Sequence, residues 1–227
     1  MHILILLLLL LAVIFGPQIW AKKILTKYSK PREDFPGTGG ELARHLLAQM
    51  KMSHIKVEVT ELGDHYDPIE KTVRLTQANW EGKSLTAVAT AAHEVGHAIQ
   101  DHIGYQPLHA RTKLVAIAQA AEKIGAGLMI MMPIITVVAR IPAAGVLMFL
   151  GGLASLGTSV VVHLVTLPVE WDASFKRALP ILKKGQYISV NDQGAARRIL
   201  MACALTYVAS SLASLLNLWR WIAILRR

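Results

Sequence analysis

The sequence predicts a mostly α-helical integral membrane protein, with about four transmembrane helices and a small α+β domain that faces water. Two observations lead to this fold class. Hydrophobic residues make up 53% of the 227 residues and charged residues only 17%, whereas about a quarter of the residues are charged in an ordinary soluble domain. The apolar residues are also concentrated in long runs, which are separated by a mixed polar stretch from about residue 32 to residue 123.

The first apolar run covers residues 3–20, which is close to the shortest length that crosses a ~30 Å hydrocarbon layer as a helix. A cleaved signal peptide is the alternative interpretation. It would carry positive charge before the run and small residues at a cleavage site. Here the lysines follow the run, and QIWAKK has no such cleavage pattern. We therefore expect an N-terminal transmembrane anchor over residues 1–21.

Residues 22–123 have the composition of a folded, water-facing domain. The stretch IKVEVTE alternates apolar and polar residues, and TVRLT follows the turn-rich LGDHYDPIEK, so we expect two short strands. An amphipathic helix is expected before them in TGGELARHLLAQM, because four apolar residues recur there at helical spacing: Leu42, Leu46, Leu47 and Met50. These elements form a small α+β unit ahead of a helix that carries TAAHEVGHAIQ.

Long apolar runs return after Lys123. They predict a transmembrane helical hairpin over residues 124–168 and a C-terminal membrane helix over residues 199–227, with a polar segment over residues 169–198 between them. The basic residues that flank these runs lie on one side of the predicted layout: Lys22, Lys23, Lys123, Lys176, Arg177, Arg197 and Arg198. By the positive-inside rule, we expect a multi-pass protein of the cell membrane with its polar domain in the cytoplasm.

The formal net charge is +9. The Lys and Arg residues sit beside apolar segments and form no stripe with interleaved aromatic residues, so anionic lipid headgroups explain them better than a nucleic acid does. We therefore expect the lipid bilayer as a partner and no nucleic acid. Cys203 is the single cysteine and lies in an apolar stretch, which excludes an intrachain disulfide and indicates a small core residue.

The motif HEVGH, residues 93–97, indicates a zinc site. Positions four apart share one face of an α-helix, so His93 and His97 can aim ring nitrogens at the same ion. In H-E-x-x-H enzymes the glutamate, here Glu94, is the general base beside the metal. A helix that carries two histidines by accident is the alternative, but Gly96 and the neighbouring alanines are typical of a closely packed site.

A catalytic zinc ion needs a third protein ligand and keeps one position for water. The candidates are Asp101, His102, His109, His163, Glu170 and Asp172. Asp101 and His102 continue the same helix and would have to wrap back to the metal. Glu170 is favoured because it opens the polar segment, and two predicted crossings return it to the side of the histidines. Its alternative role is that of an acid in the first turn of a helix.

Five segments resemble, in the same order, the blocks of YugP-like bacterial membrane zinc metallopeptidases, also called zinc-dependent peptidase family 2. These are DHYDP, VRLT, AAHEVGHAIQD, LPVEWDASFKRAL and AARRILMACALTYVAS, and they cover nearly the whole chain. The resemblance implies a zincin-like catalytic domain over residues 22–123, bound Zn²⁺, metal ligands His93 and His97, and Glu94 as the catalytic acid and base. It also implies that the polar segment supplies Glu170 as the third ligand.

The chain resembles more distantly the gluzincin-like membrane peptidases in which E-x-x-x-D follows H-E-x-x-H. It departs from that pattern, because Ser174 rather than Asp stands four residues after Glu170. This departure leaves open whether Asp172 supports the metal ligands or has no part in the site.

The expected function is that of a membrane-bound zinc-dependent endopeptidase, which hydrolyses polypeptides, membrane proteins among them, with Glu94 as general base. His65 and Tyr66 are candidate donors to the oxyanion, although a turn stabilised by Asp64 and Asp67 explains the same residues. The VRLT strand could bind an extended peptide along its edge.

Three other functions stay open. A zinc-stabilised membrane scaffold or regulatory protein would need four protein ligands and no open position on the metal. An intramembrane-cleaving metalloprotease would place the motif in a spanning helix, but the apolar stretch around the motif is too short. A transporter would need buried ionisable groups in the spans, where His163 is the main candidate.

Overall fold

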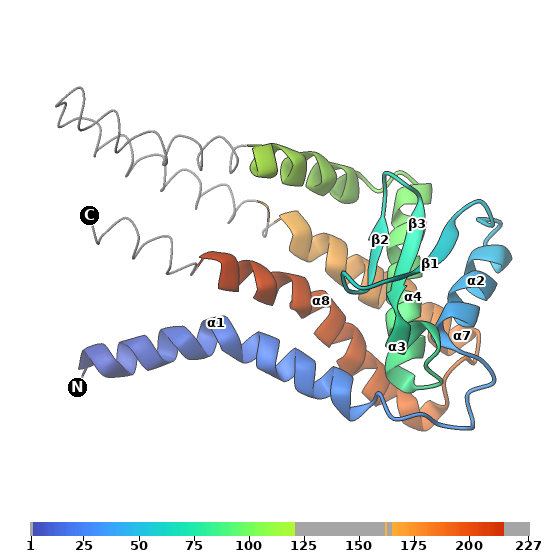
Figure 1. Cartoon of the computed structure of the whole chain (residues 1–227), viewed down its shortest axis with the longest axis horizontal. Coiled ribbons are helices and arrows are strands. Elements are labelled where there is room, and N and C mark those ends of the chain that lie inside the picture. The colour runs from blue at the N-terminus through green and yellow to red at the C-terminus, as the bar shows by residue number, and fades with distance from the viewer. Residues whose placement is uncertain (1, 121–161, 163–164, 216–227) are drawn as a thin grey trace.

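The computed structural model describes residues 2–120, 162 and 165–215 (Figure 1). Residues 106–120 and 165–171 are helical. The other elements are α1 (His2–Lys27), α2 (Gly39–Gln49), β1 (Lys56–Thr60), β2 (His65–Asp67), β3 (Thr72–Thr76), α3 (Gln77–Trp80), α4 (Leu85–His102), the π-helix η1 (Asp172–Ala178), α7 (Leu179–Lys184), the 3-10 helix η2 (Val190–Asp192) and α8 (Gln193–Leu215).

The predicted fold class, a mostly α integral membrane protein with about four transmembrane helices, is wrong for the described part of the chain. Those residues form an α+β domain, and none of their helices combines the length and hydropathy that a membrane crossing needs. Part of the apolar surface assigned to lipid is instead covered by protein, because Ile199 and Leu200 of α8 are buried in the core of the domain. Most of the hairpin expected over residues 124–168, and residues 216–227, lie outside the described residues.

Helix α2 begins where the apolar periodicity predicts. The Thr38 hydroxyl accepts a hydrogen bond from the backbone N–H of Glu41, and the Glu41 carboxylate accepts one from the backbone N–H of Thr38. This reciprocal capping box satisfies two N–H groups that would otherwise lack partners in the first turn. The helix then buries Leu46 and Leu47 in the core, as their spacing predicts.

The sheet has three strands in the order β1-β3-β2, with β1 parallel and β2 antiparallel to β3. Both predicted strands are present, as β1 and β3. The third, β2, lies in the segment expected to be only a turn, because three residues are too few to show a period of two. The VRLT segment belongs to the central strand β3 and is paired on both sides. The prediction that its edge could bind a peptide is therefore wrong.

Helix α4 occupies the centre of the domain. It begins at Leu85, where the side chain of Ser84 accepts a hydrogen bond from the backbone N–H of Ala87, and most of its residues are buried. It contacts the sheet and α2, and also η1 and α8. Figure 1 shows α4 beside the small sheet, with α8 running along α1 away from it. The helix that carries the H-E-x-x-H motif is therefore held by elements from both ends of the chain.

Gly96 allows η1 to approach α4 closely. A Cβ atom built at Gly96 would lie 2.8 Å from the backbone oxygen of Ala173 in η1, which is closer than real Cβ contacts allow. The obstacle is backbone rather than a flexible side chain, so the two helices would have to separate to make room. The small residues of the motif helix thus set the distance at which η1, and the Glu170 that precedes it, can lie.

We expect Gly96→Ala to reduce the free energy of unfolding by about 1–3 kcal/mol, because it overpacks a closed helix contact. Gly194→Ala is the matched control. Gly194 lies in α8, and a Cβ atom added to it would have no atom within 4 Å, so alanine there should be neutral or stabilise by up to about 1 kcal/mol through helix propensity. Urea unfolding of the full chain measures both. Equal effects of the two substitutions would contradict the close contact.

Candidate metal centre

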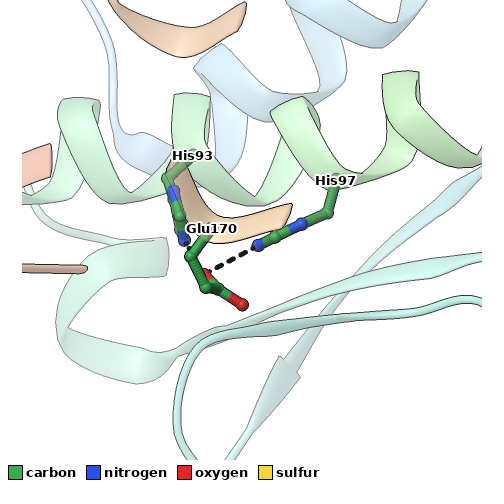
Figure 2. Close-up of side chains that lie close together, drawn as sticks. All are labelled: His93, His97 and Glu170. Carbon is green, nitrogen blue, oxygen red and sulfur yellow. Dashed lines mark hydrogen bonds and ion pairs between the residues drawn. The ribbon is translucent and has the colours of Figure 1, made fainter. Parts of the chain in front are cut away.

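The side chains of His93, His97 and Glu170 converge on one point. Both histidines project from the same face of α4, four residues apart, and Glu170 comes from the helix formed by residues 165–171. Figure 2 shows the two rings pointing from α4 toward the carboxylate. The ligand-type atoms of the three residues lie within 4.8 Å of one another, and all three residues are buried. Such a group could hold a metal ion.

The distances within this group fit a tetrahedral zinc site. The Nε2 atoms of His93 and His97 each lie 3.3 Å from Oε2 of Glu170. Ligand atoms bound at about 2.0–2.1 Å to a tetrahedral ion are about 3.3–3.4 Å from each other. A direct charge-assisted hydrogen bond between a histidine and a carboxylate would be shorter, about 2.7–2.9 Å. The spacing therefore suits an ion among the three atoms better than a bond between them.

The protonation of His93 is set by Ser174, which lies in η1. The Ser174 hydroxyl has a single hydrogen, which it donates to the backbone oxygen of Leu200 at 3.0 Å. It must therefore accept at its other contact, 3.0 Å from Nδ1 of His93. A proton on Nδ1 leaves Nε2 with its lone pair directed at the group. Ser174 thus orients His93 from the position at which the E-x-x-x-D pattern has an aspartate.

The position of Leu200 also accounts for serine in place of that aspartate. An ionised carboxylate at residue 174 could accept from His93, but it has no hydrogen to donate to the Leu200 carbonyl. Two acceptors would then face each other in a fully buried place, since Ser174 has no exposed surface. A hydroxyl satisfies both neighbours at once.

The protonation of His97 is set in the same way by Gln100. The Gln100 amide donates to the backbone oxygen of Val169 at 2.8 Å and to Oδ1 of Asp172 at 3.0 Å. Both of its hydrogens are used, so its oxygen faces Nδ1 of His97 at 2.9 Å and accepts. Arg177 donates to the same Asp172 oxygen at 3.1 Å. Asp172 therefore acts on His97 through Gln100 and is not one of the convergent ligands.

The orientation of Glu170 is set by Arg111, from the helix formed by residues 106–120. Nη1 of Arg111 lies 3.3 Å from Oε1 of Glu170, and Oε2 is the oxygen that faces both histidines. The two oxygens thus have different partners. This arrangement presents one oxygen, rather than both, to the metal position.

Burial and neighbouring charges shift the pKa values of the two buried glutamates in opposite directions. Burial works to raise the pKa of Glu170, but the electrostatic influence of His97 and His93 outweighs it and holds that pKa well below its usual range. For Glu94 the compensation is incomplete. Burial raises the pKa of Glu94 to about 7; the charge of His93 opposes the increase, and the charge of Glu170 adds to it. Glu94 is thus a buried acid that exchanges its proton near neutral pH.

A cavity of about 420 Å³ opens onto this group. Its lining includes Glu94 and Arg111 next to the three convergent side chains, together with His65 and Tyr66 of the edge strand β2. A cavity of this size can admit part of an extended polypeptide but not a folded domain. The general base expected from the sequence, the metal ligands and an edge strand therefore share one space.

The other predicted ligands lie elsewhere. Asp101 accepts from Tyr66 and pairs with Lys71, and the ring of His102 lies against that of His54 at a centroid distance of 6.2 Å. His109 belongs to none of the metal-type groups in the described residues. His163 lies outside the described residues.

The two predicted oxyanion donors already use their hydrogens in other bonds. The hydroxyl of Tyr66 donates to Asp101 at 2.6 Å, so its hydrogen is not available to an oxyanion. Nδ1 of His65 lies 2.8 Å from the backbone oxygen of Gly63 and donates to it, so a neutral His65 has no second hydrogen to offer. The alternative interpretation of this segment as a stabilised turn agrees with Asp64, which accepts from the backbone N–H and hydroxyl of Thr76.

Sequence reasoning missed the roles of Ser174, Gln100 and Arg111. Gln100 lies three residues after His97 on the same helix, so helical spacing alone could have placed it beside that ring. In the sequence, Ser174 stands out only as a departure from a pattern. Nothing in the sequence connects Arg111 with Glu170, because they come from helices that only the tertiary structure brings together.

Two histidines and one glutamate thus converge beside a buried acid and a cavity, and they form a group that could hold a metal ion. The family described as "Putative neutral zinc metallopeptidase" matches residues 3–226, and the chain belongs to this family. The chain is 34% identical over 212 residues to the "Putative membrane protease YugP" of Bacillus subtilis (strain 168), which covers 92% of this chain and 90% of that relative. No solved structure matches it.

These findings confirm the predicted resemblance to YugP-like peptidases. They also confirm zinc as the cofactor, because the family is one of zinc peptidases and the structure provides a group of residues that fits the ion.

We expect Ser174→Ala and Gln100→Leu each to weaken zinc binding by about 10- to 100-fold, because each leaves one histidine free to adopt the wrong tautomer. Competition with a zinc chelator measures the affinity without any assay of activity. Ser189→Ala is the control, since it removes a hydroxyl that caps η2, away from the metal centre. Unchanged zinc affinity in both test variants would contradict the orienting role.

The raised pKa of Glu94 predicts a pH dependence of stability in the metal-free protein. The folded state holds the proton more tightly than the unfolded state, in which the pKa of this group is near its ordinary value of 4.5. This contribution to stability is complete below pH 4.5 and is lost as the pH rises through about 7. Glu94→Gln lacks it.

The melting temperature of the metal-free Glu94→Gln protein should therefore exceed that of the wild type by an amount that grows between about pH 5 and pH 8. Glu170 does not contribute in this window, because its lowered pKa affects stability only below pH 4.5. Thermal unfolding in the presence of a chelator measures the difference, and a constant difference would contradict the raised pKa of Glu94.

Proposed function

We propose that this protein is a zinc-dependent endopeptidase in which His93, His97 and Glu170 hold the zinc ion and Glu94 is the general base. The observation that carries this proposal is the pair of 3.3 Å distances from the two ring nitrogens to one carboxylate oxygen, beside a buried acid that lines the same cavity. The family and the name of the Bacillus relative support hydrolysis of peptide bonds.

Zinc, when bound at these residues, supplies a Lewis acid that polarises the scissile carbonyl and lowers the pKa of water. The residues of the chain supply proton transfer and orientation. Glu94 lines the same cavity and would accept a proton from the attacking water and return it to the leaving amine. Ser174 and Gln100 keep the ring nitrogens of the histidines unprotonated on the side of the metal.

The substrate would bind as an extended chain along β2. This strand is at the edge of the sheet, and its residues His65 and Tyr66 line the cavity. Main-chain hydrogen bonds to an edge strand tolerate many sequences. Of the two predicted oxyanion donors, Tyr66 is committed to Asp101, so His65 in its protonated form is the one that could donate.

A purely structural zinc site is supported less well. It would need a fourth protein ligand, and among the described residues the convergent group has three members. A cavity also adjoins the group, whereas a structural site is closed. The cytoplasmic location of the site and the lipid bilayer as a partner stay predictions from the sequence. The printed name of the Bacillus relative, a membrane protease, agrees with a role at a membrane.

The test of the proposed function is Glu94→Gln in the full chain. We expect this variant to keep its zinc, because Glu94 is not a ligand, and to lose hydrolysis of unfolded casein by a factor of about 10²–10⁴, the usual contribution of a general base. Glu33→Gln, which changes an exposed acid in the loop after α1, is the matched control and should be fully active. A Glu94→Gln protein with full zinc and full activity would rule out this mechanism.

A further inference from the structure

The cavity extends beyond the metal group along α4. Thr86, Thr90, His93 and His97 follow one another at spacings of four, three and four residues, which places them on one face of the helix. All four line the cavity. The metal group occupies the C-terminal end of this face, and the two threonines occupy the N-terminal end. Next to the two threonines, at what we call the far end of the cavity, lie Leu25 of α1, whose backbone oxygen accepts from Thr86, and Cys203 of α8, which bonds to Thr90; Thr206, one turn further along α8, also lines the cavity.

Most of the polar hydrogens of the far end are already used in hydrogen bonds within its wall. The hydroxyl of Thr86 donates to the backbone oxygen of Leu25 at 2.8 Å, and that of Thr206 donates to the backbone oxygen of Ala202 at 2.6 Å. The hydroxyl of Thr90 and the thiol of Cys203 bond to each other at 3.8 Å. Such a wall offers a ligand methyl groups, sulfur and one remaining hydrogen, which belongs to either Thr90 or Cys203.

The charges near the far end are also satisfied. Asp64 lines the cavity, but one of its oxygens accepts from Thr76 and the other accepts from Asn79 at 2.7 Å. Among the described residues of the lining, Arg111 alone is a lysine or arginine, and it is paired with Glu170 at the metal end. An acidic side chain in the far end would meet no cation, and a basic one would meet a carboxylate that already has donors.

We infer that the far end of the cavity is a specificity subsite, which receives the substrate side chain next to the cleaved bond and selects small to medium uncharged apolar side chains. This inference rests on the proposed peptidase function, because it concerns the side chain that neighbours the metal-bound group. An apolar side chain gains by burial against Leu25, Cys203 and the threonine methyl groups. A charged side chain loses its hydration; an acidic one finds no free cation, and a basic one finds only a carboxylate that already has donors.

The experiment uses the zinc-loaded full chain and three peptide hydroxamates, which differ only in the side chain next to the hydroxamate: leucine, aspartate or lysine. Binding is measured by calorimetry, so no cleavage is required. We expect the leucine compound to bind at least about 10-fold more tightly than the other two, in line with the usual discrimination of apolar pockets. Equal binding, no binding, or tighter binding of a charged compound would overturn the subsite.

Two variants test whether residues of the far end determine the selectivity. Cys203→Leu should fill the subsite and shift the preference from leucine to alanine hydroxamate. Thr206→Lys introduces a cation at an exposed position of the lining and should improve binding of the aspartate compound about 10-fold or more. Ser29→Lys is its matched control, because Ser29 is also exposed and also donates to a backbone oxygen of its own segment, that of Thr26, but does not line the cavity.

Cleavage of unfolded casein, with the new termini read by mass spectrometry, separates this inference from the proposed function. The subsite and the peptidase function are both supported if the wild type cleaves next to apolar residues and this preference changes in Thr206→Lys but not in Ser29→Lys. Cleavage without preference overturns the subsite and leaves the peptidase function standing. Leucine-selective hydroxamate binding without any cleavage overturns the peptidase function and leaves a selective apolar subsite beside the zinc.

Discussion

The close contact between α4 and η1 at Gly96 is the constraint on which the metal centre depends. A carboxylate oxygen of Glu170 lies 3.3 Å from two ring nitrogens at once, so a shift of η1 by the thickness of one methyl group would remove it from one or both. Gly96 has no such group, and the backbone of Ala173 occupies the space. Helix packing thus provides the precision that the site needs.

Each convergent side chain is oriented by a partner from the surrounding fold. Ser174 of η1 bonds to His93, Gln100 of α4 bonds to His97, and Arg111 pairs with Glu170. Ser174 and Gln100 in turn bond to the backbone of Leu200 and Val169. The state of the metal ligands is therefore linked to the packing of α8 and of the helix before η1. A hydroxyl, and not a carboxylate, fits between an imidazole N–H and a carbonyl oxygen.

One face of α4 serves two purposes. Its C-terminal half carries the histidines, and its N-terminal half carries threonines whose hydroxyls bond to their own surroundings. The same helical repeat that brings two imidazoles to one ion thus also extends the cavity away from the ion. Metal binding and the proposed selection of the substrate side chain would thus depend on adjacent turns of the same helix.

The sequence by itself determined what is local. The pairing of His93 with His97, the position of Glu94, helix α2 and strands β1 and β3 all follow from periodicities of a few residues. The type and position of the residue in the chain also favoured Glu170 over the other candidates for the third metal ligand. Only the tertiary structure decided that Ser174, Gln100 and Arg111 orient the ligands, and that β2 rather than β3 is open at its edge. It also decided that protein covers the start of the apolar run in α8, because hydropathy measures how apolar a segment is and not whether lipid or protein lies against it.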